Sequence, residues 1–166
     1  MASSKGLTIL ALIIGIGGLG MSGYTLLFAL PVKTQSTIQN IWYASNSNSV
    51  SINDFDTIIP DLSIAATVNP GESLHIFFNS DVFFYSQSGI EILYVYISLN
   101  GIKVAPPVAT FGAEFGIKVW GTLSLQYSNL TIAPGLYNIG IIADMAGDAS
   151  PEESLYDMTL LAFTCA

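Results

Sequence analysis

The chain has 166 residues, a formal net charge of −8 and only 10% charged residues. Its four basic residues are all lysines, so no arginine is present, and twelve acidic residues oppose them. A chain with this charge balance is a poor binder of phosphate backbones, which effectively excludes nucleic acid as a partner. So few charges are also unusual for a monomer that stays soluble alone, which suggests strand faces covered by neighbouring subunits.

An uncharged apolar run extends from Leu7 to Leu30. As a helix rising about 1.5 Å per residue, it would cover roughly 36 Å, enough for a hydrocarbon core about 30 Å thick. We therefore predict a transmembrane α-helix over residues 7–31, preceded by a cytoplasmic N-terminus over residues 1–6. The membrane is thus an expected partner.

The orientation of this helix is predicted from the part of the chain that follows it, because Lys5 and Lys33 flank the run almost symmetrically. That part has β-type patterns and one acceptor sequon, Asn129-Leu130-Thr131, which makes Asn129 a candidate glycosylation site. We expect a single-pass protein of the cell membrane whose C-terminal domain is extracellular.

Three fates of the N-terminus stay open. An uncleaved signal-anchor is favoured, because the run exceeds the roughly 7–15 apolar residues of a cleavable signal and no A-x-A site follows it. Cleavage by a conventional signal peptidase is the second. The third rests on Lys5-Gly6, which resembles the leader of type IV prepilins and archaellins and would place cleavage between Gly6 and Leu7. Ala11, however, stands where bacterial pilins usually place a glutamate.

Alternation of apolar and polar residues, which is typical of β-strands, dominates the part of the chain that follows the predicted helix. Residues 32–51 are predicted to be a polar stalk with a possible first strand at 38–43, and residues 52–166 a β-sandwich ectodomain. Asn100-Gly101 is the strongest hairpin signal, and Pro106-Pro107 should end the strand that follows it. Within the ectodomain, strands are predicted at 62–68, 74–78, 90–99, 102–105, 117–127, 137–143 and 156–164. The fold class is all-β, a two-sheet sandwich of about eight to ten antiparallel strands behind one helix.

Several of these segments resemble a known jelly-roll family. They are Asn69-Pro70-Gly71-Glu72-Ser73-Leu74, Ser124-Leu125-Gln126-Tyr127, the run from Leu130 to Ile139 and the closing run from Leu155 to Phe163. They are similar to the turns and last strands of the tumour-necrosis-factor and complement family, which also occurs at phage tail tips. The resemblance implies a jelly roll that assembles as a homotrimer and recognises other macromolecules.

Few residues are suited to catalysis. His75 is the sole histidine, and alternation predicts that it lies on a sheet surface with Phe77, opposite Leu74 and Ile76. Cys165 is the sole cysteine, so an intrachain disulfide is impossible. No Gly-x-Ser-x-Gly elbow is present. We predict that the protein is not an enzyme.

Acidic residues gather before the last strand and could supply oxygen ligands for calcium. The candidates are Asp144, Asp148, Glu152 and Asp157, and a second acidic group is Asp54, Asp56 and Asp61. The EF-hand spacing is absent, and the favoured alternative is a solvated acidic loop that keeps an apolar domain soluble. No other cofactor is expected.

Aromatic residues suggest a contact surface. Tyr94, Tyr96 and Trp120 lie on strand faces opposite the best-patterned core positions, as interface aromatics do. The alternative, held equal, is that a long loop covers these faces.

Two functions follow from these predictions. The first is a non-catalytic, membrane-anchored cell-surface protein whose sandwich mediates recognition of an unknown surface ligand, adhesion or self-assembly. The second is a pilin-like or archaellin-like subunit of an extracellular filament, processed after Gly6. A viral envelope protein fits as well as the first.

Overall fold

The computed structural model describes residues 36–52, 56–86, 89–146 and 154–166 of the chain. Ser36–Ala166 form one compact unit. The predicted transmembrane helix and the candidate cleavage site at Gly6 and Leu7 lie outside the described residues. Within the described ranges, no helix long and apolar enough to cross a membrane occurs.

Nine strands make up the described part of the chain. They are β1 (Ile38–Asn46), β2 (Val50–Ser51), β3 (Thr57–Val68), β4 (Ser73–Tyr85), β5 (Ile90–Leu99), β6 (Ile102–Glu114), β7 (Lys118–Asn129), β8 (Gly135–Ala146) and β9 (Ser154–Cys165).

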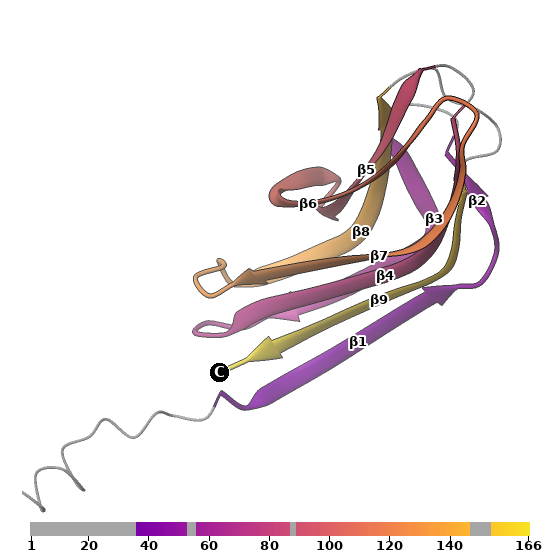
Figure 1. Cartoon of the computed structure of the whole chain (residues 1–166). Helices are drawn as coiled ribbons and strands as arrows, with labels where there is room; N and C mark the ends of the chain where they lie inside the picture. The colour runs from indigo at the N-terminus through magenta and orange to yellow at the C-terminus, as the bar shows by residue number, and fades with distance from the viewer. Residues whose placement is uncertain (1–35, 53–55, 87–88, 147–153) are drawn as a thin grey trace, which may run out of the picture. The chain divides into compact units, whose positions relative to one another are not determined.

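The strands form two antiparallel sheets (Figure 1). One sheet has the order β1-β9-β4-β7, with the short β2 also beside β9, and the other has the order β3-β8-β5-β6. The pairing is nested, because β1 pairs with β9, β3 with β8, β4 with β7 and β5 with β6. The predicted all-β fold with two sheets is confirmed.

Alternation along the strands places the core between the two sheets. In β4, Leu74, Ile76 and Phe78 are fully buried, whereas His75 and Phe77 point to the opposite face and are half-buried. This is the arrangement predicted for His75. β5 and β8 supply the opposing layer, with Val95 among its fully buried side chains. Successive residues of a strand point to opposite faces, so a period-two sequence forms one apolar face per sheet.

The predicted hairpin between β5 and β6 is present. Asn100 and Gly101 have φ values of 55° and 80°, the left-handed conformation that a two-residue turn of this kind requires. The Asn100 Oδ1 accepts a hydrogen bond from the Asn138 backbone N–H at 2.8 Å, which ties the turn to β8.

The prediction that Pro106 and Pro107 end the following strand is wrong. β6 continues to Glu114, and the register passes from Ile97 opposite Val104 to Tyr96 opposite Val108. The proline segment therefore protrudes from the ladder, and Figure 1 shows β6 curling away there. β6 is the edge strand of its sheet, so a residue without an N–H loses no pairing on the open side.

The first strand belongs to the sandwich instead of a separate stalk. β1 pairs with β9 from Ile38 to Asn46 and forms an edge of its sheet. Trp42 and Ala44 pack against the core from this strand. The compact unit therefore begins at Ser36, before the predicted boundary at residue 52.

Candidate interaction surface

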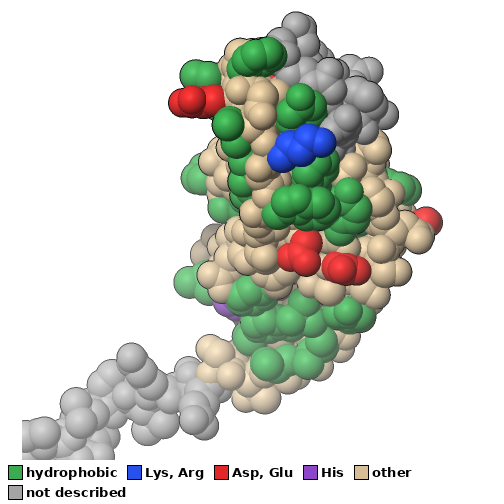
Figure 2. Space-filling view, turned by 45° about the vertical axis from the view of Figure 1, so that its right-hand side comes forward, with side chains coloured by type: hydrophobic (Ala, Val, Ile, Leu, Met, Phe, Trp, Pro, Cys, Tyr) green, Lys and Arg blue, Asp and Glu red, His purple; other side chains and the backbone are tan. Residues whose placement is uncertain are grey.

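The outer face of the β1-β9-β4-β7 sheet exposes hydrophobic side chains in two groups. Figure 2 shows hydrophobic side chains gathered above and below a pair of acidic side chains. We call the first group the Phe163 patch; it consists of Ile41, Tyr43, Phe77, Leu161 and Phe163. We call the second group the Trp120 platform; it consists of Phe83, Trp120 and Tyr156.

The Phe163 patch is built from two rows across β1, β9 and β4. Tyr43 is opposite Leu161, which is opposite Phe77, and the next row begins with Ile41 opposite Phe163. The rings of Phe77 and Phe163 stack with centroids 5.8 Å apart and planes 10° apart. Tyr43 and Ile41 on the edge strand are 64% and 63% exposed. The patch is thus a contiguous apolar surface whose outer rim is open.

His75 completes the second row of this patch. Its ring stacks on Phe163 with centroids 5.0 Å apart. Its Nδ1 is 2.9 Å from the Ser128 Oγ, and its Nε2 is 3.1 Å from the Ser73 Oγ. Both ring nitrogens thus have hydroxyl partners within the sheet, and the contacts are those of a structural histidine.

A polar band separates the Phe163 patch from the Trp120 platform. In it, the Ser124 Oγ donates to the Asn79 Oδ1 at 2.7 Å, and the Thr122 Oγ1 donates to the Asp81 Oδ1 at 3.0 Å. Both hydrogen bonds join β7 to β4 on the exposed side. They fix the Asp81 carboxylate beside the platform.

The Trp120 platform contains the most open aromatic ring of this face. Trp120 is 69% exposed. Its ring lies 4.5 Å from Phe83 and 5.9 Å from Tyr156, and the planes of Trp120 and Tyr156 differ by only 28°. A hollow of about 560 Å³ lies against it, lined by Asp81, Trp120, Gly121, Thr122, Tyr156 and Asp157.

A β-bulge in β9 shapes this hollow. Asn79 is opposite Thr159, but Asp81 is opposite Tyr156, so Asp157 and Met158 together oppose the single residue Ser80. Asp157 has a φ of 43°, in the left-handed region. The Ser80 hydroxyl, which is buried, donates to the Tyr156 carbonyl at 2.9 Å. Because the bulge breaks the alternation, the adjacent Tyr156 and Asp157 both line the hollow.

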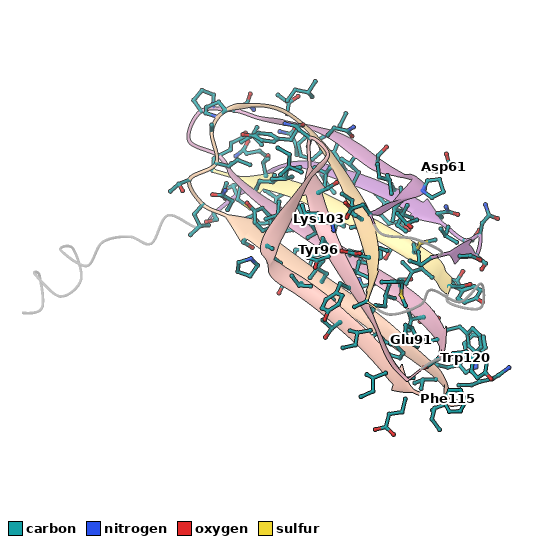
Figure 3. The ribbon with its side chains drawn as sticks, turned by 90° about the horizontal axis from the view of Figure 1, so that it is seen from above. Asp61, Glu91, Tyr96, Lys103, Phe115 and Trp120 are labelled. Carbon is teal, nitrogen blue, oxygen red and sulfur yellow. The ribbon has the colours of Figure 1, made fainter. Side chains whose placement is uncertain are left out.

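The other sheet presents a charged group. The Lys103 ammonium pairs with Asp56 and with Asp144, the latter at 2.8 Å, and lies 4.6 Å from the centroid of the Tyr96 ring. The hydrogen bond that Lys103 donates to Asp144, and then the one it donates to Asp56, raise the pKa of Lys103 above its usual value. Figure 3 shows Lys103 next to Tyr96. The group couples β5, β6 and β8 and leaves Lys103 little freedom to bind elsewhere.

The structure separates the three aromatic residues predicted as one contact surface. Tyr94 and Tyr96 are half-buried on β5, whereas Trp120 is exposed on β7 of the other sheet. Figure 3 shows Trp120 away from Tyr96. Sequence reasoning missed the Phe163 patch, although Leu161 and Phe163 alternate with buried positions of β9.

The candidate calcium ligands are dispersed in the described part of the chain. Asp144 pairs with Lys103, and Asp157 lies at the bulge. Asp148 and Glu152 fall outside the described residues, as does Asp54. Asp56 belongs to the Lys103 group, and Asp61 has a φ of 56°. Among described residues, no three His, Cys, Asp or Glu side chains gather in a way that suits a metal ion.

The predicted glycosylation site lies where β7 ends. The Asn129 Nδ2 donates to the Tyr127 hydroxyl at 3.1 Å, and its Oδ1 accepts from the Thr131 N–H at 3.0 Å. Leu130, the middle residue of the sequon, is 74% exposed. A glycan on Asn129 would take the place of one hydrogen of the amide nitrogen that donates to Tyr127.

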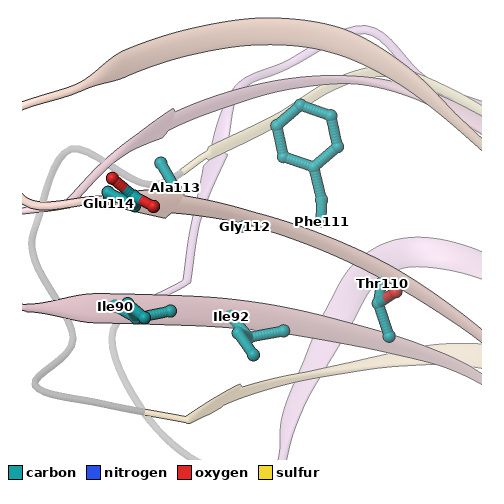
Figure 4. Close-up of a pocket in the computed structure, with 7 residues that line it drawn as sticks. All are labelled: Ile90, Ile92, Thr110, Phe111, Gly112, Ala113 and Glu114. Carbon is teal, nitrogen blue, oxygen red and sulfur yellow. The ribbon is translucent and has the colours of Figure 1, made fainter.

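A further hollow, of about 400 Å³, lies between β5 and β6 (Figure 4). Its lining residues are Ile90, Ile92, Thr110, Phe111, Gly112, Ala113 and Glu114. Its only charged lining residue is Glu114, and no converging polar set accompanies it. The hollow offers less recognition chemistry than the one beside Trp120.

Comparisons with known proteins show no family for this chain. No protein-family model matches the chain, and no curated protein sequence matches it. A solved structure of infectious bursal disease virus Gx strain aligns with this chain at a TM-score of 0.39 and 14% sequence identity. The match covers 76% of this chain and 34% of that chain, so this chain spans about a third of its length.

Proposed function

We propose that the chain is a non-catalytic, membrane-anchored cell-surface protein whose sandwich binds other macromolecules, including further copies of itself. The observation that carries this proposal is the outer face of the β1-β9-β4-β7 sheet. Exposed apolar patches rimmed by polar residues mark contact sites in soluble domains. The apolar run at residues 7–30 would supply the anchor.

We further propose that the sandwich is a jelly roll. The nested pairing of the strands supports this assignment, because β1 pairs with β9, β3 with β8, β4 with β7 and β5 with β6. A jelly roll is a long antiparallel hairpin wound so that its strands alternate between two sheets. The connections from β3 to β4 and from β4 to β5 each change sheets, which is consistent with such winding.

The Phe163 patch is the proposed self-association surface. It includes the edge strand β1, where Ile41 and Tyr43 are open. A second copy of the chain is the proposed occupant, because the sequence has too few charges to keep such a face soluble alone. The lack of a charged side chain among the five patch residues also removes the cost of burying one.

The oligomeric state of the full chain in detergent tests this proposal. Wild type should sediment as an oligomer of the chain. Tyr43→Asp should sediment as a monomer with an unchanged circular dichroism spectrum, because it places a charge in the contact. Ile102→Asp is the matched control, since Ile102 is 72% exposed on β6 in the other sheet, and it should remain an oligomer. A wild type that is monomeric at every concentration would exclude self-association.

A filament subunit is the second candidate. Lys5-Gly6 directly before the apolar run favours it, because prepilin-like leaders end in this way. The intact mass of the protein from its native membrane distinguishes the two. A mass beginning at Leu7 indicates the filament subunit, and a mass beginning at Met1 or Ala2 indicates the anchored protein. Excess mass lost on deglycosylation would place Asn129 outside the cell.

A further inference from the structure

The Trp120 platform brings two kinds of side chain together around one hollow. One is a pair of nearly parallel aromatic rings, Trp120 and Tyr156, with planes 28° apart. The other is a set of hydrogen-bonding groups in the same hollow, namely Asp81, Thr122 and Asp157. A few converging polar groups beside an apolar wall are typical of a small-molecule site.

The bulge is what brings these groups together. In a regular strand, Tyr156 and Asp157 would point to opposite faces, and one of them would leave the hollow. The extra residue and the left-handed φ of Asp157 place both in its lining. Strained backbone at a non-glycine residue is found preferentially at binding sites, because the surrounding structure has to hold it. Here the hydrogen bond that the Ser80 hydroxyl donates to the Tyr156 carbonyl holds the backbone at the bulge.

We propose that the Trp120 platform is a binding site for neutral glycans. A pyranose ring has an apolar C–H face that fits flat against an aromatic ring, and its edge carries hydroxyl donors. Asp81 and Asp157 would accept hydrogen bonds from these hydroxyls, and charge-assisted bonds of this kind are strong. The Asp81 carboxylate is already oriented by Thr122, so little ordering is needed on binding.

The negative charge of the hollow and of the chain favours a neutral sugar over an acidic one. Two carboxylates in the hollow and a net charge of −8 on the chain repel acidic sugars. The two carboxylates would also attract a quaternary ammonium ligand, but the rings of Trp120 and Tyr156 stack on each other and do not form an enclosing cage.

This inference rests on the proposed function in one respect, because it names a ligand class for the recognition surface. It does not require self-association, since the Trp120 platform and the Phe163 patch share no residue.

The test is nuclear magnetic resonance titration of the full chain in a polyoxyethylene detergent, which carries neither a sugar nor an ammonium group. The chain has two tryptophans. The Trp120 indole N–H should therefore report the site, and that of Trp42, which packs against the core, serves as an internal control. The probes are neutral oligosaccharides of glucose, galactose, mannose and N-acetylglucosamine, a sialylated oligosaccharide, and choline.

At least one neutral oligosaccharide should shift the Trp120 resonance and leave that of Trp42 in place. For that sugar, calorimetry should show that Trp120→Ala weakens binding at least about tenfold, whereas Trp120→Phe, which keeps an aromatic face, weakens it less. Asp157→Asn, which tolerates the left-handed backbone, should weaken binding by removing the charge. Leu136→Ala is the control, because Leu136 is 68% exposed on β8, and its binding should equal wild type.

The outcomes separate the two proposals. Glycan binding by the Tyr43→Asp monomer would support the inference whether or not the protein self-associates. A shift caused only by choline, or only by the sialylated sugar, would overturn the inference in favour of a charged ligand. No response to any neutral oligosaccharide, or unchanged binding by Trp120→Ala, would also overturn it, even if the protein is an oligomer.

Discussion

Asp157 determines the shape of the Trp120 platform from a single backbone position. Its φ of 43° lies in a region that L-residues enter at a cost, which is smallest for Gly, Asn and Asp. The residue is exposed, so packing does not dictate its identity. The identity of this residue is therefore set by the conformation that the bulge demands.

Asp157→Val should destabilise the domain by about 1–2 kcal/mol, because a β-branched side chain is strained at this φ. Asp157→Asn should leave the free energy of unfolding almost unchanged. Urea denaturation followed by fluorescence measures both. Equal stabilities of the two variants would mean that the bulge relaxes without strain.

Glu72 secures the turn between β3 and β4. Its carboxylate accepts hydrogen bonds from the Asn69 backbone N–H at 2.9 Å and from the Asn69 Nδ2 at 3.0 Å. The bond from the Asn69 side chain, followed by that from its backbone, lowers the pKa of Glu72 below its usual value of 4.5. The ionised form is thus favoured in the folded state.

The Glu72 carboxylate stabilises the fold above its unfolded pKa of 4.5, and that contribution disappears as the pH falls through the lower folded pKa. Glu72→Gln should therefore be less stable than wild type at pH 7, and the difference should shrink below pH 4.5. Denaturation at several pH values measures it, and Asn69→Ala should reduce the same dependence. A difference that does not vary with pH would contradict this account.

At the scale of the elements, two glycines let strands approach one another. A Cβ on Gly112 of β6 would lie 2.8 Å from the Glu91 carbonyl oxygen of β5. A Cβ on Gly121 of β7 would lie 2.7 Å from the tip of the Phe111 ring. The Glu91 carbonyl belongs to backbone that is held by the pairing of β5 with β6. The Phe111 ring, in contrast, is the end of a side chain that can turn.

Gly112→Ala should therefore cost more stability than Gly121→Ala. We expect about 2–3 kcal/mol for the first and about 1 kcal/mol for the second, within the range typical of overpacking. Thermal and urea unfolding of the two single variants provide the comparison. A larger loss for Gly121→Ala would mean that the Phe111 ring is more rigidly held than the β5 backbone.

At the scale of the whole molecule, both sheets have exposed apolar side chains, among them Ile58, Ile90, Ile102 and Leu136 on the β3-β8-β5-β6 sheet. That sheet also carries Lys103, which pairs with Asp56 and Asp144. A cation at Asp144 would compete with the Lys103 ammonium, which is 2.8 Å away and faces no translational cost of binding.

We therefore expect calcium to leave the stability of the molecule unchanged. The thermal transition of the full chain should be the same with saturating Ca²⁺ and with excess chelator, because only a ligand that binds the folded state raises it. Lys103→Met serves as the comparison, since it frees Asp144. A higher transition temperature in Ca²⁺ that chelator reverses would instead establish a calcium site.

Local pattern was sufficient to predict most of the strands. β5 was predicted with the bounds it has, Ile90–Leu99, and the Asn100-Gly101 turn follows it as expected. Alternation is a local property, since each residue's face depends only on its neighbours along the strand. His75 was placed on the sheet surface for the same reason.

The sequence by itself thus determined the all-β class, the two-sheet sandwich and the outward faces of its strands. Only the tertiary structure decided which strands pair, and therefore which outward-pointing side chains become neighbours. Ile41 and Phe163 are more than a hundred positions apart, yet β1 pairs with β9 and makes them neighbours. The bulge at Asp157 depends equally on the register of β9 against β4. Alternation shows that a side chain points outward, but pairing between distant strands determines what it meets there.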